Sequence, residues 1–358
     1  MKSIFIRYLF NLFNCLQCDK RKRKQILFLL LSLTVAGIIG LRIFYDSPRY
    51  LPADHKFHNF DNISGANELI IPNIVHYIIF GKDTLGFVPF LSILSALKVQ
   101  QPQKLYVHSD AVKFGGHYWT ILKTAVSFPN TSLEVLHRPR PTHVFGQPLS
   151  SVYHATDVAR IQVLMECGGI YVDTDTLILR PLDRFRRFEM ALGWPLGGFL
   201  GTQVVKRRNA CILRCNCVLL AHKDARFLPL WLESYKRYQP RDWYYNAGQR
   251  PTQQILEKAP YLVHRVPGLF GVQNLAARLY GPAPWPQWRL LCTIHLLSRH
   301  PPAPQSMDEN YVMRYRTPFG EIARWLLWRL QPRVAFNKTA LLHVYTSSSN
   351  ASSCTSKA

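Results

Sequence analysis

A helix, a glycine pair and a strand in residues 151–181 constrain this chain most. Residues 152–167 contain no Pro or Gly and carry a dense apolar set, which predicts a largely buried helix of about four turns. Gly168 and Gly169 follow, and two residues without a Cβ let the chain turn where others would clash. The β-branched residues of 170–179 then predict a strand.

Four charged side chains take defined positions in this pattern. Asp157 and Arg160 are three residues apart, which places them on one face of the helix. The period of two along the strand places Tyr171, Asp173 and Asp175 on one face. We therefore expect two carboxylates to point the same way from an apolar strand.

Two neighbouring carboxylates on a buried strand require a compensating cation. Burial of one unpaired carboxylate costs several kcal/mol, and a second one adds repulsion. Hard oxygen ligands suit Mn²⁺ or Mg²⁺. Such an ion has coordination positions for diphosphate oxygens and neutralises the charge that develops on a leaving phosphate.

The full motif resembles the sugar-binding region of the DXD-containing glycosyltransferases. That family includes α-1,4-galactosyltransferases, fungal initiating mannosyltransferases and, more distantly, glucosylating clostridial toxins. The resemblance extends over about residues 69–299, and its strongest part reads Asp157-x-x-Arg160, Gly168-Gly169-Ile170-Tyr171 and Asp173-Thr174-Asp175.

The resemblance implies an α/β chain with a GT-A-type nucleotide-sugar transferase fold and a mainly parallel central sheet. It implies that Asp173 and Asp175 reach the metal and the donor ribose, and that Asp157 and Arg160 bind the donor sugar and diphosphate. These four residues are the catalytic candidates. The family retains anomeric configuration, so an α-linked product is implied, and no nucleophile is assigned.

Further site residues follow from the same resemblance. The donor base is expected at the end of the first strand, at Ile79, Phe80 and Gly81, although Phe80 is equally well explained as a core residue. Tyr171 is a donor-site candidate. His295, at the end of a late strand, is a candidate third metal ligand.

Two other groups have two interpretations each, and a third has one. His154 is predicted to pack at the helix start, the alternative being that it faces the nucleotide. The aromatics of residues 243–251 belong to the core or stack against an acceptor sugar. His76 and His108 are predicted to be packed, hydrogen-bonded strand residues.

Alternating strands and helices predict a parallel sheet with flanking helices. In such sheets, ligands bind at the carboxyl ends of the strands. The other predicted elements are strands at 73–81, 104–108, 216–221 and 291–295, and helices at 91–99, 227–238 and 320–330.

An apolar segment follows a basic cluster near the N-terminus. Residues 20–24 are all Lys or Arg, and residues 26–45 carry one charge, Arg42. Twenty helical residues span roughly the 30 Å hydrocarbon core, and the basic flank places the N-terminus in the cytosol. A cleaved signal peptide is the alternative. The predicted parts are a cytosolic tail (1–24), a signal anchor (25–45), a polar stem (46–68), a lumenal catalytic domain (69–300), a C-terminal extension with a helix (301–345) and a disordered tail (346–358).

Four glycosylation sequons lie on the predicted lumenal side, at Asn62, Asn130, Asn337 and Asn350. Together with the anchor they favour a single-pass type II Golgi membrane protein. The net charge of +23 suggests nucleic acid as a partner, but the predicted lumenal location disfavours that interpretation, so no nucleic-acid partner is expected.

The expected function is metal-dependent transfer of a hexosyl or N-acetylhexosaminyl group from a nucleotide sugar, UDP-linked, to a glycan or glycolipid. One alternative is a non-catalytic carbohydrate- or nucleotide-sugar-binding protein on the same fold, which would have lost the carboxylates or Arg160. Another is a two-metal phosphohydrolase, which would need more ligands than His154 and Glu166 near the motif.

Overall fold

The computed structural model describes residues 24, 28–37, 55–124, 130–194, 217–271 and 275–328. The chain divides into two compact units, Met1–Tyr50 and Leu51–Ala358. In the first, residues 28–37 are helical. Among the helices of the described residues, none combines the length and the apolar character that crossing a bilayer requires. Most of the predicted anchor at 25–45 lies outside the described residues, so the anchor stays a prediction.

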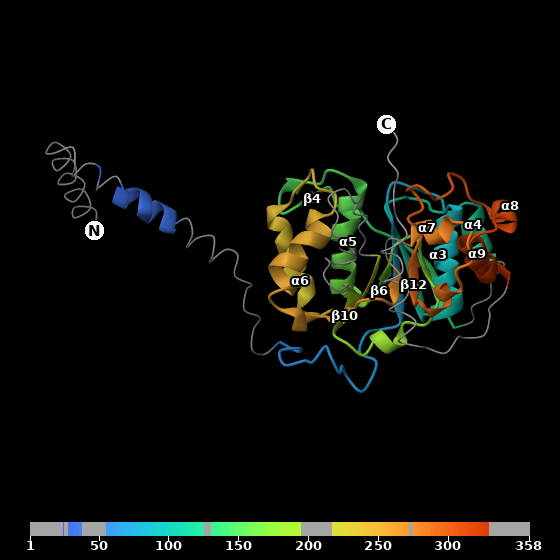
Figure 1. Cartoon of the computed structure of the whole chain (residues 1–358), viewed down its shortest axis with the longest axis horizontal. Coiled ribbons are helices and arrows are strands. Elements are labelled where there is room, and N and C mark those ends of the chain that lie inside the picture. The colour runs from blue at the N-terminus through green and yellow to red at the C-terminus, as the bar shows by residue number, and fades with distance from the viewer. Residues whose placement is uncertain are drawn as a thin grey trace. The chain divides into compact units, whose positions relative to one another are not determined.

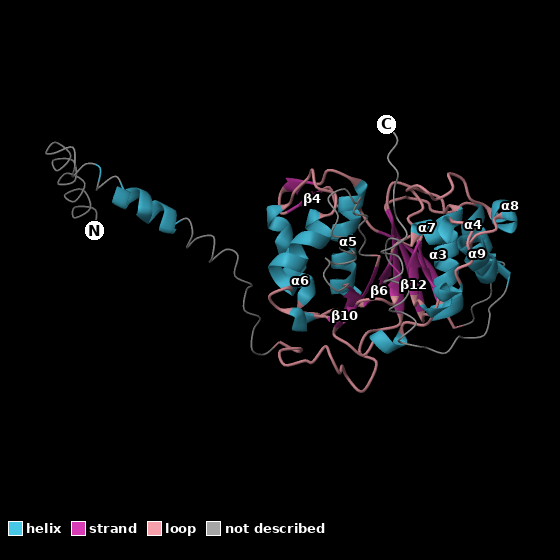
Figure 2. Ribbon diagram, viewed as in Figure 1, coloured by secondary structure: helices cyan, strands magenta, loops and turns pink. Residues whose placement is uncertain are grey.

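The second unit is built on a seven-stranded sheet (Figures 1 and 2). Strands β1, β2, β3 and β6 pair in parallel, as do β8 and β10, whereas β9 is antiparallel to β6 and β8. The predicted α/β class with a mainly parallel central sheet is therefore confirmed. In spatial order the strands are β10 (His264–Val266), β8 (Met190–Gly193), β9 (Val218–Ala221), β6 (Gly169–Val172), β1 (Ile74–Ile79), β2 (Lys104–Ser109) and β3 (Ser132–His137).

A smaller sheet lies beside the end of β6. Its middle strand, β12 (Thr293–His295), pairs in parallel with β11 (Phe270–Gly271) and antiparallel with β7 (Thr176–Ile178). A separate two-stranded hairpin joins β4 (His143–Val144) to β5 (Gln147–Pro148).

Helices cover both faces of the large sheet, as Figure 1 shows. On one face lie α5 (Val152–Cys167) and α6 (Phe227–Ser234), and on the other lie α3 (Phe87–Ser95), α4 (His117–Thr124) and α9 (Pro318–Trp328). Strand β1 alternates accordingly, because Val75 and Tyr77 belong to the core under α3 whereas Ile78 belongs to the core under α5. The shorter helices are α7 (Ala276–Tyr280), α8 (Glu309–Arg314), the 3₁₀ turns Asp183–Phe185, Tyr235–Arg237, Pro260–Leu262 and Pro286–Leu290, and the π-helical turns Ala96–Gln100, Tyr245–Gln249 and Thr252–Leu256.

Most predicted elements are present, with one important correction. Helix α5 has the predicted bounds, and the predicted strands at 73–81, 104–108, 216–221 and 291–295 are found with shorter or shifted ends. The predicted strand 170–179 is wrong as one element. It is two strands, β6 and β7, that belong to different sheets and are joined by a turn at residues 173–175.

Two buried histidines connect three elements at the base of the sheet. The Nε2 of His76 lies 2.9 Å from the Gly168 carbonyl oxygen, which only accepts, so this nitrogen carries the proton. His76 Nδ1 therefore accepts from His108 Nε2 at 3.1 Å, and His108 Nδ1 accepts from Arg138 Nε at 3.4 Å. Both rings are thus neutral, which confirms the prediction that they are packed and hydrogen-bonded.

Part of the predicted stem packs against the globular unit. Phe57 is buried, and Asn62, at 3% exposure, donates from Nδ2 to Glu189 Oε2 at 3.0 Å and to the Tyr261 carbonyl at 2.9 Å. The buried Arg226 pairs with Glu189 and donates to the His58 carbonyl at 3.0 Å. Residues 57–62 are therefore an integral part of the fold, although they lie within the segment 46–68 that was predicted to be a stem. The sequon at Asn62 is enclosed.

Candidate active site

Helix α5 positions two of the predicted residues. Its N-cap, Ser151, accepts a hydrogen bond from the His154 N–H, and the helix ends at Gly168, with φ +65°. Asp157 and Arg160 face inward, and Arg160 Nη2 donates to Asp157 Oδ1 at 2.8 Å. The helical spacing of three residues therefore produces the predicted pair.

Gly169 lets the next strand approach β1 closely. Its φ is +115°, and an added Cβ would lie 2.5 Å from the Ile74 carbonyl oxygen and 2.9 Å from His76 Nε2. A side chain there would clash with backbone atoms. The strand that leads to the carboxylates is placed by this contact.

Asp173 and Asp175 lie in a turn and not on one strand face. The Asp173 N–H donates to the Cys217 carbonyl at 2.8 Å, and its own carbonyl accepts from the Thr176 N–H at 2.9 Å. Strand β7 then pairs with β12, so that Thr176 stands opposite His295. The two carboxylates converge because the chain changes sheets between them.

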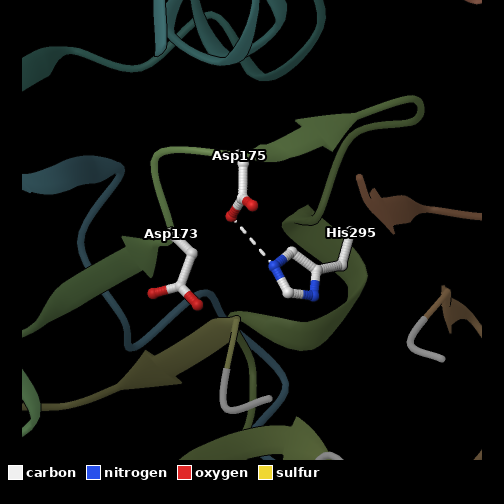
Figure 3. Close-up of side chains that lie close together, drawn as sticks. All are labelled: Asp173, Asp175 and His295. Atoms are coloured by element: carbon white, nitrogen blue, oxygen red, sulfur yellow. Dashed lines mark hydrogen bonds and ion pairs between the residues drawn. The ribbon is translucent and has the colours of Figure 1, made fainter. Parts of the chain in front are cut away.

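Asp173, Asp175 and His295 form a cluster that can hold a metal ion (Figure 3). One ligand atom from each residue lies within 4.8 Å of the others. Two carboxylates and an imidazole fit Mn²⁺, and the oxygens also suit Mg²⁺. The predicted ligands are therefore brought together, including His295, which is more than a hundred residues from the motif.

Asp175 is held from two sides. Its Oδ1 lies 2.9 Å from His295 Nε2, and its Oδ2 accepts from the Ser298 N–H at 3.2 Å and the Ser298 hydroxyl at 3.1 Å. Between His295 and Ser298 in the chain, Leu297 has φ +50°, a left-handed conformation that a non-glycine residue rarely adopts. This conformation accompanies the close approach of Ser298 to the carboxylate.

The charges at the site are strongly coupled. Burial would raise the pKa of Asp175, but the charge and hydrogen bond of His295 outweigh it and hold that pKa well below its usual range. Burial likewise lowers the pKa of His295, and the Asp175 carboxylate overcomes this and raises it to about 9. A protonated His295 would neutralise Asp175, and a bound metal would take over that role from the imidazolium proton.

Asp157 and Asp173 share Arg160. Its Nη2 lies 3.5 Å from Asp173 Oδ1, and its guanidinium carbon lies 4.6 Å from the centre of the Tyr171 ring. The Tyr171 hydroxyl donates to the same Asp173 oxygen at 2.5 Å. Burial raises the pKa of Asp157 to about 6, although the nearby Arg160 acts to lower it. Arg160 and Tyr171 therefore hold the Asp173 carboxylate in its position beside the other two ligands, Asp175 and His295.

The predicted base-binding residues lie at the end of β1. Ile79 and Phe80 are buried in separate hydrophobic cores, and Gly81, with φ +70°, donates its N–H to Asp110 Oδ1 at 2.7 Å. Arg140 lies 3.7 Å from the same carboxylate. Asp110 and Arg140 were not predicted, although Asp110 directly follows β2, at the carboxyl edge where ligands bind.

His154 is packed, as predicted. It is buried, its Nε2 donates to the Trp243 carbonyl at 3.3 Å, and its Nδ1 contacts the hydroxyl groups of Ser150 and Tyr238. Its ring thus joins the start of α5 to residue 243.

Comparison with known proteins agrees with the motif. Residues 127–191 match the family model described as glycosyltransferase sugar-binding region containing DXD motif. This part of the chain is therefore similar to a DXD-type sugar-binding region. The resemblance inferred from the motif is thereby confirmed, and the matched stretch contains Asp157, Arg160, Asp173 and Asp175.

Individual proteins that resemble this chain over a longer stretch have low sequence identity to it. Over 253 residues the chain is 24% identical to glucan organizing enzyme 1 of Cryptococcus neoformans, an alignment that covers 68% of this chain and 60% of that protein. Solved structures with similarity include the galactosyltransferase LgtC with donor and acceptor sugar analogs (14% identity, 71% of this chain, 96% of that one, TM-score 0.38). They also include GlyE of Streptococcus pneumoniae (10%, 78% and 64%, TM-score 0.41) and the PaToxG glycosyltransferase (19%, 53% and 70%, TM-score 0.34).

Proposed function

We propose that this protein is a metal-dependent glycosyltransferase of the GT-A type that uses a nucleotide-sugar donor, UDP-linked. The observation that carries the proposal is the cluster of Asp173, Asp175 and His295, with Arg160 3.5 Å from Asp173. The match of residues 127–191 to the sugar-binding region supports it. The transferred group is a hexosyl or N-acetylhexosaminyl unit, and the acceptor is a glycan or glycolipid.

Each residue has a role in this proposal. Asp173, Asp175 and His295 would hold Mn²⁺ or Mg²⁺, which when bound neutralises the diphosphate and the charge that develops on it. Arg160 adds a fixed buried cation near the same place. Asp157, held by Arg160, accepts a hydrogen bond from a donor-sugar hydroxyl, and Tyr171 fixes the rotamer of Asp173.

We propose retention of anomeric configuration, by analogy with the family the motif resembles. Glu166, the other carboxylate of α5, forms an exposed ion pair with Arg138. Asp157 is paired with Arg160. We therefore assign neither carboxylate as a nucleophile. In the mechanism we propose, the acceptor attacks on the face from which the phosphate leaves, and that phosphate accepts the acceptor's proton.

We further propose a single-pass type II Golgi location. The basic cluster at 20–24 followed by the apolar residues 26–45 supports it. Protease protection of an epitope at the C-terminus in intact Golgi vesicles, with loss of that protection after detergent, is the expected result. Digestion of the epitope in intact vesicles would contradict this topology.

Nucleotide release tests the activity. The detergent-solubilised full chain is incubated with a panel of nucleotide sugars, with and without Mn²⁺. We expect metal-dependent UDP release from one preferred donor and a loss of roughly 10²–10³-fold in Asp173→Asn. The matched control is Asp183→Asn, whose carboxylate pairs with Arg186 at 2.7 Å outside the site. Release that is equal in both variants, or no binding of any nucleotide, would contradict the proposal.

A further inference from the structure

Two exposed aromatic side chains and an arginine contact one another at the start of α5. The Tyr153 and Trp243 rings meet edge to face with centroids 4.6 Å apart, and the Arg299 guanidinium carbon lies 4.3 Å from the Tyr153 centroid. Tyr153 is 38% exposed and Trp243 is 50% exposed. We call these three residues the aromatic platform.

Two residues of the platform are close along the chain to residues of the candidate active site. Arg299 follows Ser298, which donates two hydrogen bonds to Asp175, and its positive charge helps to lower the pKa of Asp175. Tyr153 lies on α5 four residues before Asp157, about one helical turn away. A molecule resting on the platform would therefore be next to a donor held at the metal cluster.

The Trp243 side chain contacts the Tyr153 and His154 rings but is not enclosed by them. Trp243 belongs to neither hydrophobic core, and half of its side chain is exposed, whereas the neighbouring Tyr244 is buried. Its backbone is nevertheless fixed, because its carbonyl accepts from His154 and Asp242 Oδ1 accepts from the Tyr244 and Tyr245 N–H groups at 3.3 and 3.2 Å. A large aromatic side chain that is presented to solvent by a fixed backbone is typical of a binding surface.

We propose that the aromatic platform binds the acceptor, and that the acceptor group there is a sugar ring. This inference rests on the proposed function. A pyranose has an apolar face the size of one or two aromatic rings and a rim of hydroxyl groups. The exposed Arg299 lies over the Tyr153 ring, and the exposed Arg241 and half-buried Asp242 directly precede Trp243 in the chain, so polar partners border the apolar face. An acyl chain would need a longer continuous apolar surface than two rings bordered by charges.

A glycan array tests the platform with the full chain in detergent. Binding is read with Mn²⁺ and UDP, and again with Mn²⁺ alone, for wild type, Trp243→Ala and Trp243→Phe. We expect Trp243→Ala to bind the preferred glycans about tenfold more weakly and Trp243→Phe to recover part of the loss. Trp328→Ala is the matched control, because Trp328 is 52% exposed at the end of α9.

Two results would overturn the platform: unchanged glycan binding in Trp243→Ala, or no glycan binding by the wild type. A loss of UDP affinity in Trp243→Ala would indicate a folding defect in that variant. The glycan binding of Trp243→Phe then decides whether the platform binds the acceptor. Failure of the wild type to bind UDP in the presence of Mn²⁺ would instead count against the proposed function. The glycan comparison without nucleotide would still decide the platform.

Discussion

At the scale of single residues, Arg160 is the group on which the site depends. It contacts the Asp157 carboxylate, the Asp173 carboxylate and the Tyr171 ring while being almost fully buried. Two carboxylates this close would repel each other without it. The planar guanidinium meets all three partners at once, which a lysine ammonium cannot do.

Arg160→Lys keeps the positive charge and removes this geometry. We expect UDP release to fall by about 100-fold, because a lysine ammonium cannot hold the charge in the position that the guanidinium fixes near the leaving group. The midpoint of thermal unfolding should change much less, since the buried charge is retained. Rates and unfolding curves are measured on the same preparation, and a release rate within threefold of wild type would contradict this role.

The sequence predicted the site residues best where the contacts are local. Asp157 and Arg160 pair because helical spacing brings them together. His295 was predicted only through the family resemblance, since no local pattern connects it to Asp175. Asp110, which holds the Gly81 N–H, was not predicted, because that contact forms only when β1 and β2 pair.

At the scale of elements, the turn between β6 and β7 shows where the pattern failed. Residues 170–179 have the composition of one strand, and composition does not report a change of pairing partner. Strand β6 pairs with β1 and β9, whereas β7 pairs with β12. β12 lies more than a hundred residues further along the chain. The local sequence of residues 173–175 therefore does not predict that pairing with β12 makes them a turn.

Gly169→Ala tests the close approach of β6 to β1. The added Cβ would meet backbone at 2.5 Å in a left-handed conformation, so we expect a loss of roughly 2–4 kcal/mol in the free energy of unfolding. Gly115→Ala is the control, because an added Cβ there meets nothing within 4 Å. Urea unfolding measures both, and equal effects would show that the approach is not constrained.

The hydrogen-bonded pair of buried histidines, His76 and His108, predicts a pH dependence of stability. Burial lowers the pKa of His76 to about 4. Burial, repulsion from a protonated His76 and the positive charge of Arg138 lower the pKa of His108 to about 3. Free histidine titrates near 6.5, so below that pH the unfolded chain binds protons that the folded chain does not. The contribution of these residues to stability is therefore complete above about pH 6.5 and declines as the pH falls toward 4.

His108→Gln can keep the hydrogen bonds and cannot titrate. We expect the fall in the free energy of unfolding between pH 7.5 and pH 5 to be smaller in this variant than in the wild type. His117→Gln, at an exposed histidine, is the control. Urea unfolding at each pH gives the comparison. An identical fall in the free energy of unfolding in wild type and His108→Gln would contradict the conclusion that His76 and His108 are neutral in the folded protein.

At the scale of the whole molecule, the candidate metal cluster lies where two sheets meet. Asp173 follows β6 of the seven-stranded sheet, and His295 ends β12 of the small sheet. A metal bound by both would connect the two sheets. Saturating Mn²⁺ at 100 times its Kd should add about 2.7 kcal/mol of stability.

Differential scanning fluorimetry measures this as a rise in the unfolding midpoint that EDTA reverses. We expect the rise to be lost in Asp175→Asn and retained in Asp224→Asn, at an exposed carboxylate. A rise of the same size in Asp175→Asn would place the ion elsewhere.

The enclosed position of Asn62 has a consequence for the order of events during synthesis. Its amide partners, Glu189 and the Tyr261 carbonyl, are made 127 and 199 residues later. If the chain enters the secretory pathway, the sequon at Asn62 passes the glycosylation machinery before either partner exists. An oligosaccharide attached then would occupy the space that Glu189 and Tyr261 need, so correct assembly depends on this asparagine remaining bare while the rest of the chain is translated.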